Sequence, residues 1–170
     1  MIERELKYVV DKIPQSFNKV LKIRQYYFRP SKSSKLISKL FPEAMDIRTY
    51  RLRIIDDKAI LTLKTEGILS RNEYEKEVDQ EIKELILSDE ITSEIIKNRY
   101  FYYFDNYTVE LDEYLNLKNK LLTAEVEYFS DDISYHKKNI ESILVNNLDL
   151  EISDVSFDFR YKNSNLHQFF

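Results

Sequence analysis

Charged and apolar residues alternate along one segment of this chain after another. In the opening segment, Glu3, Glu5 and Lys7 alternate with Leu6 and Tyr8. Successive side chains of a β-strand point to opposite faces of its sheet, so this spacing puts the charged residues on one face and the apolar residues on the other. Carboxylates and ammonium groups are costly to bury unless a metal, an anion or an opposite charge contacts them. The pattern therefore constrains both the fold and the ligand that its charged face can hold.

The alternating segments are rich in aromatic and β-branched residues, which is typical of strands. Strands are predicted at residues 2–10, 21–29, 47–56, 58–65, 71–79, 100–105, 107–114, 121–129 and 155–161. Turn-forming residues separate several of these segments, as at Asp56-Asp57 and Asp105-Asn106. The chain is therefore predicted to consist mainly of strands, several of them joined by short turns.

The spacing of apolar residues predicts three helices, at residues 14–20, 81–98 and 134–147. A break in the second helix is expected near Ser88-Asp89, and Ser134 is expected to cap the third helix. Residues 30–46 are interpreted as an insertion that begins with a basic stretch and continues as a short amphipathic segment. The basic stretch, residues 31–39, is either a flap that attracts polyphosphate or a solvated loop.

Length and composition indicate a single α+β domain over residues 1–170, long enough to bury a core. Hydrophobic residues make up 43% of the chain and charged residues 33%, which indicates a globular protein with an unusually charged complement. No apolar run approaches the roughly 18 residues that span a bilayer, and no signal-peptide pattern opens the chain. A cytoplasmic protein without membrane contact is therefore expected.

Composition also excludes several kinds of site. The chain has no cysteine, so it has no disulfide, thiolate metal site or catalytic cysteine. Its two histidines, His136 and His167, argue against a His-rich zinc or iron site. Gly67 is the single glycine, whereas a phosphate-binding loop or a dinucleotide fingerprint needs several. The net charge of -4 argues against a general nucleic-acid surface, so any phosphate must be held locally by side chains.

The charged faces of the predicted strands carry residues of both signs. The basic positions are Lys7, Arg51, Arg53, Lys64, Arg71 and Arg160. The acidic positions are Glu3, Glu5, Glu75, Glu77, Glu110, Asp112, Glu125 and Glu127. Two arrangements remain open: a sheet with one solvated face, or a barrel that closes around a charged, wet interior and carries its helices outside.

The mixture of signs indicates the class of ligand. Arginine and lysine side chains hold phosphate oxygens, and carboxylates hold a hard cation that can bridge to those oxygens. A metal–polyphosphate complex satisfies both groups. Because cysteine is absent and histidine is scarce, Mg²⁺ or Mn²⁺ is the expected cation.

Several segments resemble those of one known family. The opening IERELKY resembles the Glu-x-Glu-x-Lys signature of the CYTH domain, the family of triphosphate tunnel metalloenzymes. Further family-like segments follow in order: IRQYYF (23–28), YRLRI (50–54), LTLK (61–64), RNEYEKEV (71–78), IKNRY (96–100), VELDEY (109–114), AEVEY (124–128) and DFRYKNSNL (158–166). The resemblance extends over essentially the whole chain, and residues 30–46 are its main departure.

This resemblance implies an eight-stranded antiparallel β-barrel with a charged interior that binds a linear triphosphate and a divalent metal. The implied metal ligands are Glu3, Glu5, Glu125 and Glu127. Glu75, Glu77, Glu110 and Asp112 are implied either as ligands of a second metal or as residues of the outer coordination shell of the first. The implied phosphate ligands are Lys7, Arg51, Arg53, Lys64, Arg71, Lys97, Arg99 and Arg160. Arg71 and Arg99 could each pair structurally with a neighbouring carboxylate instead.

The implied function is metal-dependent hydrolysis of a linear triphosphate, with inorganic tripolyphosphate giving pyrophosphate and phosphate. Lys97 is the candidate for activating water, and Glu5 and Lys7 are the other candidate catalytic residues. The alternatives are an adenylate cyclase that forms cyclic AMP from ATP, or a triphosphate-binding module without turnover. The preferred triphosphate, the physiological metal and the formation of a homodimer stay open.

Overall fold

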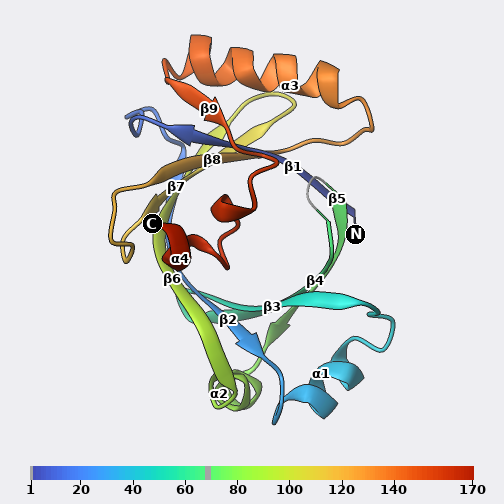
Figure 1. Cartoon of the computed structure of the whole chain (residues 1–170). Helices are drawn as coiled ribbons and strands as arrows, with labels where there is room; N and C mark the ends of the chain where they lie inside the picture. The colour runs from blue at the N-terminus through green and yellow to red at the C-terminus, as the bar shows by residue number, and fades with distance from the viewer. Residues whose placement is uncertain (1, 68–69) are drawn as a thin grey trace.

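The computed structural model describes residues 2–67 and 70–170, and the side chains of residues 4–67 and 71–170. Within this part of the chain, nine strands form one antiparallel sheet (Figure 1). The strands are β1 (Ile2–Val10), β2 (Lys19–Arg29), β3 (Ile47–Ile55), β4 (Lys58–Thr65), β5 (Ser70–Val78), β6 (Glu90–Tyr103), β7 (Thr108–Tyr114), β8 (Leu122–Glu127) and β9 (Ile152–Asp154). Their order across the sheet is β5-β4-β3-β2-β6-β7-β8-β1-β9.

The sheet curves round until β5, at one end of this order, reaches β1 near the other end (Figure 1). Three residue pairs join the two strands, among them Glu3 with Arg71 and Arg4 with Ser70. This seam is shorter than the other pairings among β1 to β8, so the predicted eight-stranded barrel is an approximate description. The ninth strand, β9, pairs with the far end of β1.

Helices cover the outer face of the curved sheet on two sides (Figure 1). They are α1 (Ser34–Leu40), α2 (Gln80–Leu87) and α3 (Ile133–Ser142) with its π-helical continuation (Ile143–Asn147). The closing segment, with a 3₁₀ turn η2 (Phe159–Tyr161) and α4 (Leu166–Phe169), lies within the ring of strands instead (Figure 1). Helix α3 packs Ile140 against an apolar layer that includes Leu6 and Val126. On the opposite side, Ile37 of α1 and Ile86 of α2 belong to a second layer over β3 and β4. Apolar strand faces therefore point outward beneath the helices.

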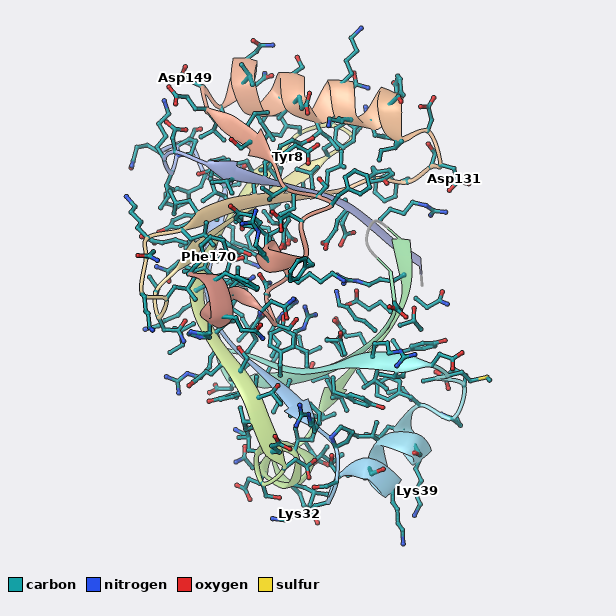
Figure 2. The ribbon with its side chains drawn as sticks, in the orientation of Figure 1. Tyr8, Lys32, Lys39, Asp131, Asp149 and Phe170 are labelled. Carbon is teal, nitrogen blue, oxygen red and sulfur yellow. The ribbon has the colours of Figure 1, made fainter. Side chains whose placement is uncertain are left out.

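Side chains on the outer face of the sheet fit this arrangement, in which helices cover apolar strand faces (Figure 2). Tyr8 is fully buried beneath α3, and its hydroxyl donates to Glu141 at 3.3 Å. At the other end of the molecule, Lys32 and Lys39 lie with the insertion on the outer side of the sheet (Figure 2). No residue of the basic stretch 31–39 lines the interior cavity described below. No helix in the described part of the chain is long and apolar enough to span a membrane.

Two predicted helices differ from the structure. Residues 14–20 form no helix, because Lys19 and Val20 already pair with β6 at the start of β2. The helix predicted over 81–98 ends at Leu87, next to the expected break at Ser88-Asp89. The following residues belong to β6, which pairs with β2 along its length. Long-range strand pairing has here outweighed a local spacing that suits a helix.

The strand predicted over 155–161 is also wrong. Strand β9 ends at Asp154, and residues 159–161 form the 3₁₀ turn η2. The Asp158 side chain accepts a hydrogen bond from the Arg160 backbone N–H at 3.0 Å. Such local side-chain bonds compete with strand pairing. The alternation of faces assumed for this segment therefore fails.

Asp89 anchors the insertion to the start of β6. Its carboxylate accepts hydrogen bonds from the backbone N–H groups of Ser31, Lys32 and Ser33 and from the Ser31 and Ser33 hydroxyls. Replacing Asp89 by Ala is expected to lower the free energy of unfolding by about 1–3 kcal/mol, because these donors lose their acceptor. Glu43→Ala, an exposed change in the same insertion, is the matched control for urea denaturation.

The contribution of Asp89 to the free energy of unfolding depends on pH. Burial alone would raise the pKa of Asp89, but the hydrogen bonds from Ser33 and Ser31 hold it below its usual value of 3.8. A depressed pKa stabilises the fold above the unfolded value, and this stabilisation is lost as the pH falls through the folded value. The stability difference between wild type and Asp89→Ala should therefore shrink below about pH 4. A difference that stays constant down to pH 2 would contradict the anchoring role.

Candidate active site

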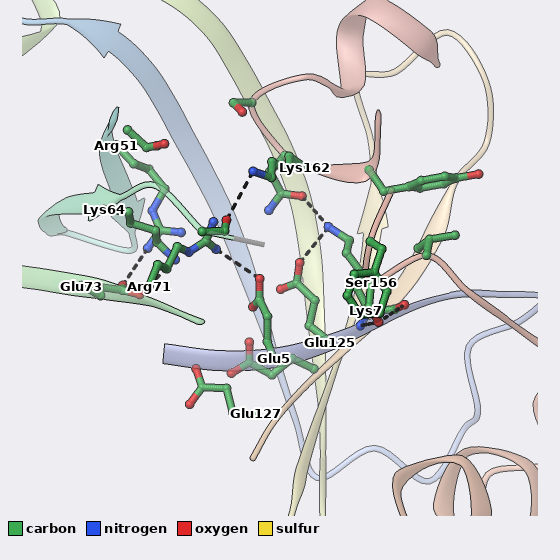
Figure 3. A pocket seen from close by; sticks show the side chains of 18 of the residues that line it. Glu5, Lys7, Arg51, Lys64, Arg71, Glu73, Glu125, Glu127, Ser156 and Lys162 are labelled. Carbon is green, nitrogen blue, oxygen red and sulfur yellow. Dashed lines mark hydrogen bonds and ion pairs between the residues drawn. The ribbon is translucent and has the colours of Figure 1, made fainter. Parts of the chain in front are cut away.

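A cavity of about 1720 Å³ lies inside the curved sheet. Each of the strands β1 to β8 contributes side chains to its lining, and most of them are charged (Figure 3). The charged or polar lining residues from these strands include Glu5, Lys7, Tyr27, Arg51, Arg53, Lys64, Arg71, Glu73, Glu75, Arg99, Glu110, Glu125 and Glu127. The charged strand faces thus enclose an interior, and the alternative of a sheet with a solvated charged face is wrong.

Strands β3 and β4 form a basic wall of the cavity. Arg51 and Lys64 are buried, and Lys64 lies 2.9 Å from Glu73. Arg51 donates to Thr62 at 3.1 Å and lies 3.6 Å from Glu73. Burial and the neighbouring Arg51 charge lower the pKa of Arg53 to about 10. The Nε atoms of both arginines are buried without a hydrogen-bond partner.

Those unpaired guanidinium atoms are informative. A buried donor without an acceptor is costly, and buried charges are normally paired. The cations at Arg51 and Arg53 are therefore incompletely satisfied by the protein itself. An anion with several oxygen acceptors fits this wall.

Lys7 faces the cavity from β1. Its Nζ lies 2.8 Å from Glu125 and donates to the Asn163 side-chain oxygen at 3.1 Å (Figure 3). Burial alone would lower the pKa of Lys7, but the charge of Glu125, together with Tyr114, Glu5 and the hydrogen bond to Glu125, raises it. The pKa of Glu125 is lowered far below its ordinary value against the effect of burial, because Lys7 and Arg99 attract its charged form. Both groups stay charged near neutral pH.

Arg99 is the centre of a buried ion network. It makes two hydrogen bonds of 2.7 Å with Asp112, one of 2.6 Å with Glu125, and a further one with Glu110. Asp112 also accepts from Lys97 at 2.5 Å, and both residues are fully buried. The guanidinium of Arg99 is thus shared among three carboxylates. This geometry favours the interpretation of Arg99 as a structural partner.

The pKa of Lys97 is lowered to about 8 by burial and by the nearby Arg99 charge. This is the direction that a water-activating lysine needs. However, Asp112 holds its Nζ, and neither Lys97 nor Asp112 lines the cavity. The geometry gives no support for direct contact between Lys97 and a substrate.

Glu5 and Glu127 are the carboxylates best placed for a cation. They are directly opposite each other on β1 and β8, and both line the cavity (Figure 3). Arg71 donates a hydrogen bond to Glu5 at 3.1 Å. Arg71 therefore makes a pair with a neighbouring carboxylate, which was the expected alternative to binding phosphate. The side chain of Glu3, the fourth implied ligand, lies outside the described residues. Glu125 is held by Lys7 and Arg99.

These donors fit a hard divalent cation. All are carboxylate oxygens, which suit Mg²⁺ or Mn²⁺. Among the described residues, no three acidic or histidine side chains converge to form a complete metal cage. Protein-bound Mg²⁺ is normally held by one or two carboxylates together with substrate phosphates, so a complete cage is not required.

A family comparison decides the identity of this fold. The model of the CYTH domain matches residues 1–161. The chain belongs to the CYTH family. The structural resemblance agrees, because the fold of this CYTH domain matches a crystal structure of an inorganic triphosphatase with a TM-score of 0.59. That match covers 97% of this chain and 93% of the other, at 25% sequence identity.

Two curated relatives of this CYTH domain carry the same name. An inorganic triphosphatase of Acetivibrio thermocellus is 33% identical over 124 residues, which cover 70% of this chain and 71% of that protein. An inorganic triphosphatase of Nitrosomonas europaea is 31% identical over 134 residues, covering 78% of this chain and 80% of the relative.

Of the remaining implied residues of this CYTH domain, two line the cavity and two do not. Glu75 lines the cavity and accepts from Thr62 at 3.0 Å, and Glu110 also lines it. Glu77 is 59% exposed and lies 3.4 Å from Lys58. Arg160 is 52% exposed and pairs with Asp158 at 2.5 Å. Neither Glu77 nor Arg160 lines the cavity.

Lys162 and Asn163 are not among the residues predicted for the site, yet both line the cavity. Figure 3 labels Lys162. Lys162 extends across the interior, and its Nζ donates to the Gly67 carbonyl at 3.4 Å. Asn163 accepts from Lys7 and from the Tyr114 hydroxyl, the latter at 2.7 Å. A signal for both residues existed in the closing segment DFRYKNSNL. The turn at Asp158 changes which of its side chains point inward.

Proposed function

We propose that this CYTH domain hydrolyses inorganic tripolyphosphate, releasing pyrophosphate and phosphate. The observation that carries the proposal is the basic wall of the cavity, to which Arg51 and Arg53 both contribute. Lys7, Lys64 and Lys162 add further cations to the same lining. The names of the two curated relatives support the same reaction.

The chemistry follows from charge. Water attacks a terminal phosphorus, the bond from that phosphorus to the bridging oxygen breaks, and pyrophosphate leaves with the electron pair. Negative charge on the transferred phosphoryl oxygens and on the leaving oxygen is stabilised by cations fixed in advance. Arg51 and Arg53 act from one wall, and Lys7 acts from β1.

Divalent metal is the second part of the proposal. Glu5 and Glu127 would hold Mg²⁺ or Mn²⁺ together with phosphate oxygens. When bound, the cation supplies charge neutralisation at those oxygens. Glu125 contributes by holding Lys7 and Arg99 in place.

Removing the metal tests the proposed role of a divalent cation. EDTA is expected to abolish turnover of tripolyphosphate. Glu5→Gln should raise the Mg²⁺ concentration for half-maximal activity by about tenfold or more, because a charged ligand is lost. Direct Mn²⁺ binding in the presence of tripolyphosphate, followed by electron paramagnetic resonance, should weaken in parallel. Glu90→Gln, an exposed change on β6, is the control. Full turnover in EDTA would rule out the metal.

The substrate is tested by measuring phosphate release from tripolyphosphate, ATP and thiamine triphosphate in parallel, each with Mg²⁺, Mn²⁺ or EDTA. Fast metal-dependent release from tripolyphosphate and slow release from the other two is the expected result. The ATP samples are also assayed for cyclic AMP. Cyclic AMP with pyrophosphate would replace the proposal by an adenylate cyclase. Metal-independent binding without turnover would replace it by a triphosphate-binding module.

A further inference from the structure

The stretch of chain that follows β9 holds Lys7 at its backbone and at the tip of its side chain. The Lys7 backbone N–H donates to the Ser156 hydroxyl at 2.9 Å, and its carbonyl accepts from the Val155 N–H at 2.9 Å. At the other end of the residue, the Lys7 Nζ donates to the Asn163 side-chain oxygen at 3.1 Å. Lys7 is therefore fixed against residues 155–163 as well as within strand β1.

The Asn163 side chain is itself held by a chain of hydrogen bonds from two strands. Lys7 can only donate, so the amide atom that faces it must be the oxygen. The same oxygen accepts from the Tyr114 hydroxyl on β7 at 2.7 Å. That hydroxyl gives its single proton to Asn163, so the Thr123 hydroxyl on β8, 3.1 Å away, donates to Tyr114. Tyr114 and Thr123 are buried, and they fix the direction of the amide.

Asn163 and Glu125 share the Lys7 ammonium between them. The Nζ atom lies 2.8 Å from Glu125 on β8, and Asn163 contacts it from a different element (Figure 3). An ammonium has three N–H donors, so two acceptors from separate elements fix where it lies and leave one donor over. Within the described part of the chain, Lys7 has no third acceptor for its side chain, which lines the cavity. The remaining N–H is available to a ligand there.

The amide of Asn163 is a neutral acceptor. A second carboxylate at this place would also hold Lys7, but its charge would repel an anion in the cavity. With no acceptor here, the ammonium would have Glu125 as its single partner, and the attraction between the two charges would draw it toward that carboxylate. An amide keeps the ammonium in place and leaves its positive charge for the ligand.

We propose that Asn163 is a positioning residue, which holds the Lys7 ammonium so that one of its N–H groups meets the transferred phosphoryl group. This role rests on the proposed function, because the Lys7 charge acts on the reaction proposed above. Asn163 acts through Lys7 and needs no contact with the substrate. Tyr114 supports Asn163 by fixing its amide.

Steady-state hydrolysis of tripolyphosphate with Mg²⁺ separates positioning from binding. Asn163→Ala is expected to lower kcat about tenfold, the size of one hydrogen bond to a charged group, and to leave KM within about threefold of wild type. Asn163→Asp keeps the acceptor, so kcat should stay within about threefold of wild type, whereas its charge should raise KM about tenfold. Asn147→Ala, an exposed change, is the matched control. A wild-type kcat in Asn163→Ala, or an Asn163→Asp variant with an equally low kcat, would overturn the role.

A double-mutant cycle shows whether Asn163 acts through Lys7. In the Lys7→Met background, Asn163→Ala should change kcat by less than about twofold, because the group that it positions is gone. Losses that multiply in the double variant would reveal an independent structural effect and overturn the positioning role. If Asn163→Ala does not fold, Tyr114→Phe takes its place, because it removes the hydroxyl that fixes the amide. It should lower kcat in wild type but not in the Lys7→Met background.

A further readout needs no turnover. Nitrogen-15 NMR of lysine side chains, recorded without substrate, detects ammonium groups whose protons exchange slowly with water. Lys7 is expected to give such a signal, identified by its loss in Lys7→Met, and Asn163→Ala should broaden or remove it. No such signal in wild type, or an unchanged signal in Asn163→Ala, would overturn the positioning role alone. The expected signals without hydrolysis of tripolyphosphate would reject the proposed function and leave the contact between Asn163 and Lys7 standing.

Discussion

Replacing Lys7 by Met is expected to lower kcat/KM for tripolyphosphate at least about 100-fold, as for removal of other fixed groups that stabilise transition-state charge. Lys7 is buried on the cavity wall and stays charged, because Glu125 raises its pKa. Its Nζ also donates to Asn163, which fixes the direction of the ammonium group. Methionine keeps an unbranched side chain one atom shorter than lysine but supplies no charge to the transferred phosphoryl group.

The fold should tolerate Lys7→Met. Glu125 keeps its hydrogen bond of 2.6 Å to Arg99, so its carboxylate is not left without a cation. Far-UV circular dichroism and the urea midpoint check this point. Lys22→Met, an exposed change on β2, is the matched control and should leave turnover at the wild-type level. A Lys7→Met enzyme within threefold of wild type would remove Lys7 from the active site.

Replacing Arg99 by Met should have the largest effect on stability, a loss of about 3–5 kcal/mol in the free energy of unfolding. The change removes the cation shared by Glu110, Asp112 and Glu125. Burial then penalises carboxylates that have lost their counter-charge. Lys97 remains bonded to Asp112, so the loss should stop short of abolishing the fold. Urea denaturation at neutral pH measures the difference.

A double variant separates structural pairing from substrate binding. Asp112→Asn in the Arg99→Met background removes one of the unpaired charges and should recover part of the lost stability. Arg24→Met is the control, because Arg24 is an exposed arginine on β2 that pairs with Glu94 at 3.3 Å. If Arg99→Met were as stable as wild type but bound tripolyphosphate poorly, Arg99 would be a phosphate ligand, as the family resemblance implies.

Where a strand is paired on both sides, the alternation of charged and apolar residues correctly predicted which side chains face the cavity. Lys7, Arg51, Arg53 and Glu125 alternate with buried apolar neighbours, and strand pairing preserves that alternation. Any one-residue slip would move these charges under the outer helices, which is a strong constraint on register. This part of the site could therefore be predicted from the sequence.

The closing segment could not be predicted in the same way. Asp158 forms a local hydrogen bond with the Arg160 backbone, and the resulting turn directs Arg160 outward. Lys162 and Asn163 enter the cavity instead. Likewise, β6 has isoleucines at spacings that suit a helix, and only its partners β2 and β7 make it a strand. Both errors arise where contacts distant in the sequence or local capping outweigh the periodic pattern.

The proposed function depends most directly on whether the protein cleaves tripolyphosphate. Phosphorus-31 NMR of tripolyphosphate with purified protein and Mg²⁺ follows substrate and both products in one sample. The expected result is loss of the tripolyphosphate signals with pyrophosphate and phosphate appearing in equal amounts, and no change in EDTA. Unchanged tripolyphosphate after prolonged incubation with Mg²⁺ or Mn²⁺ would contradict the proposed hydrolysis.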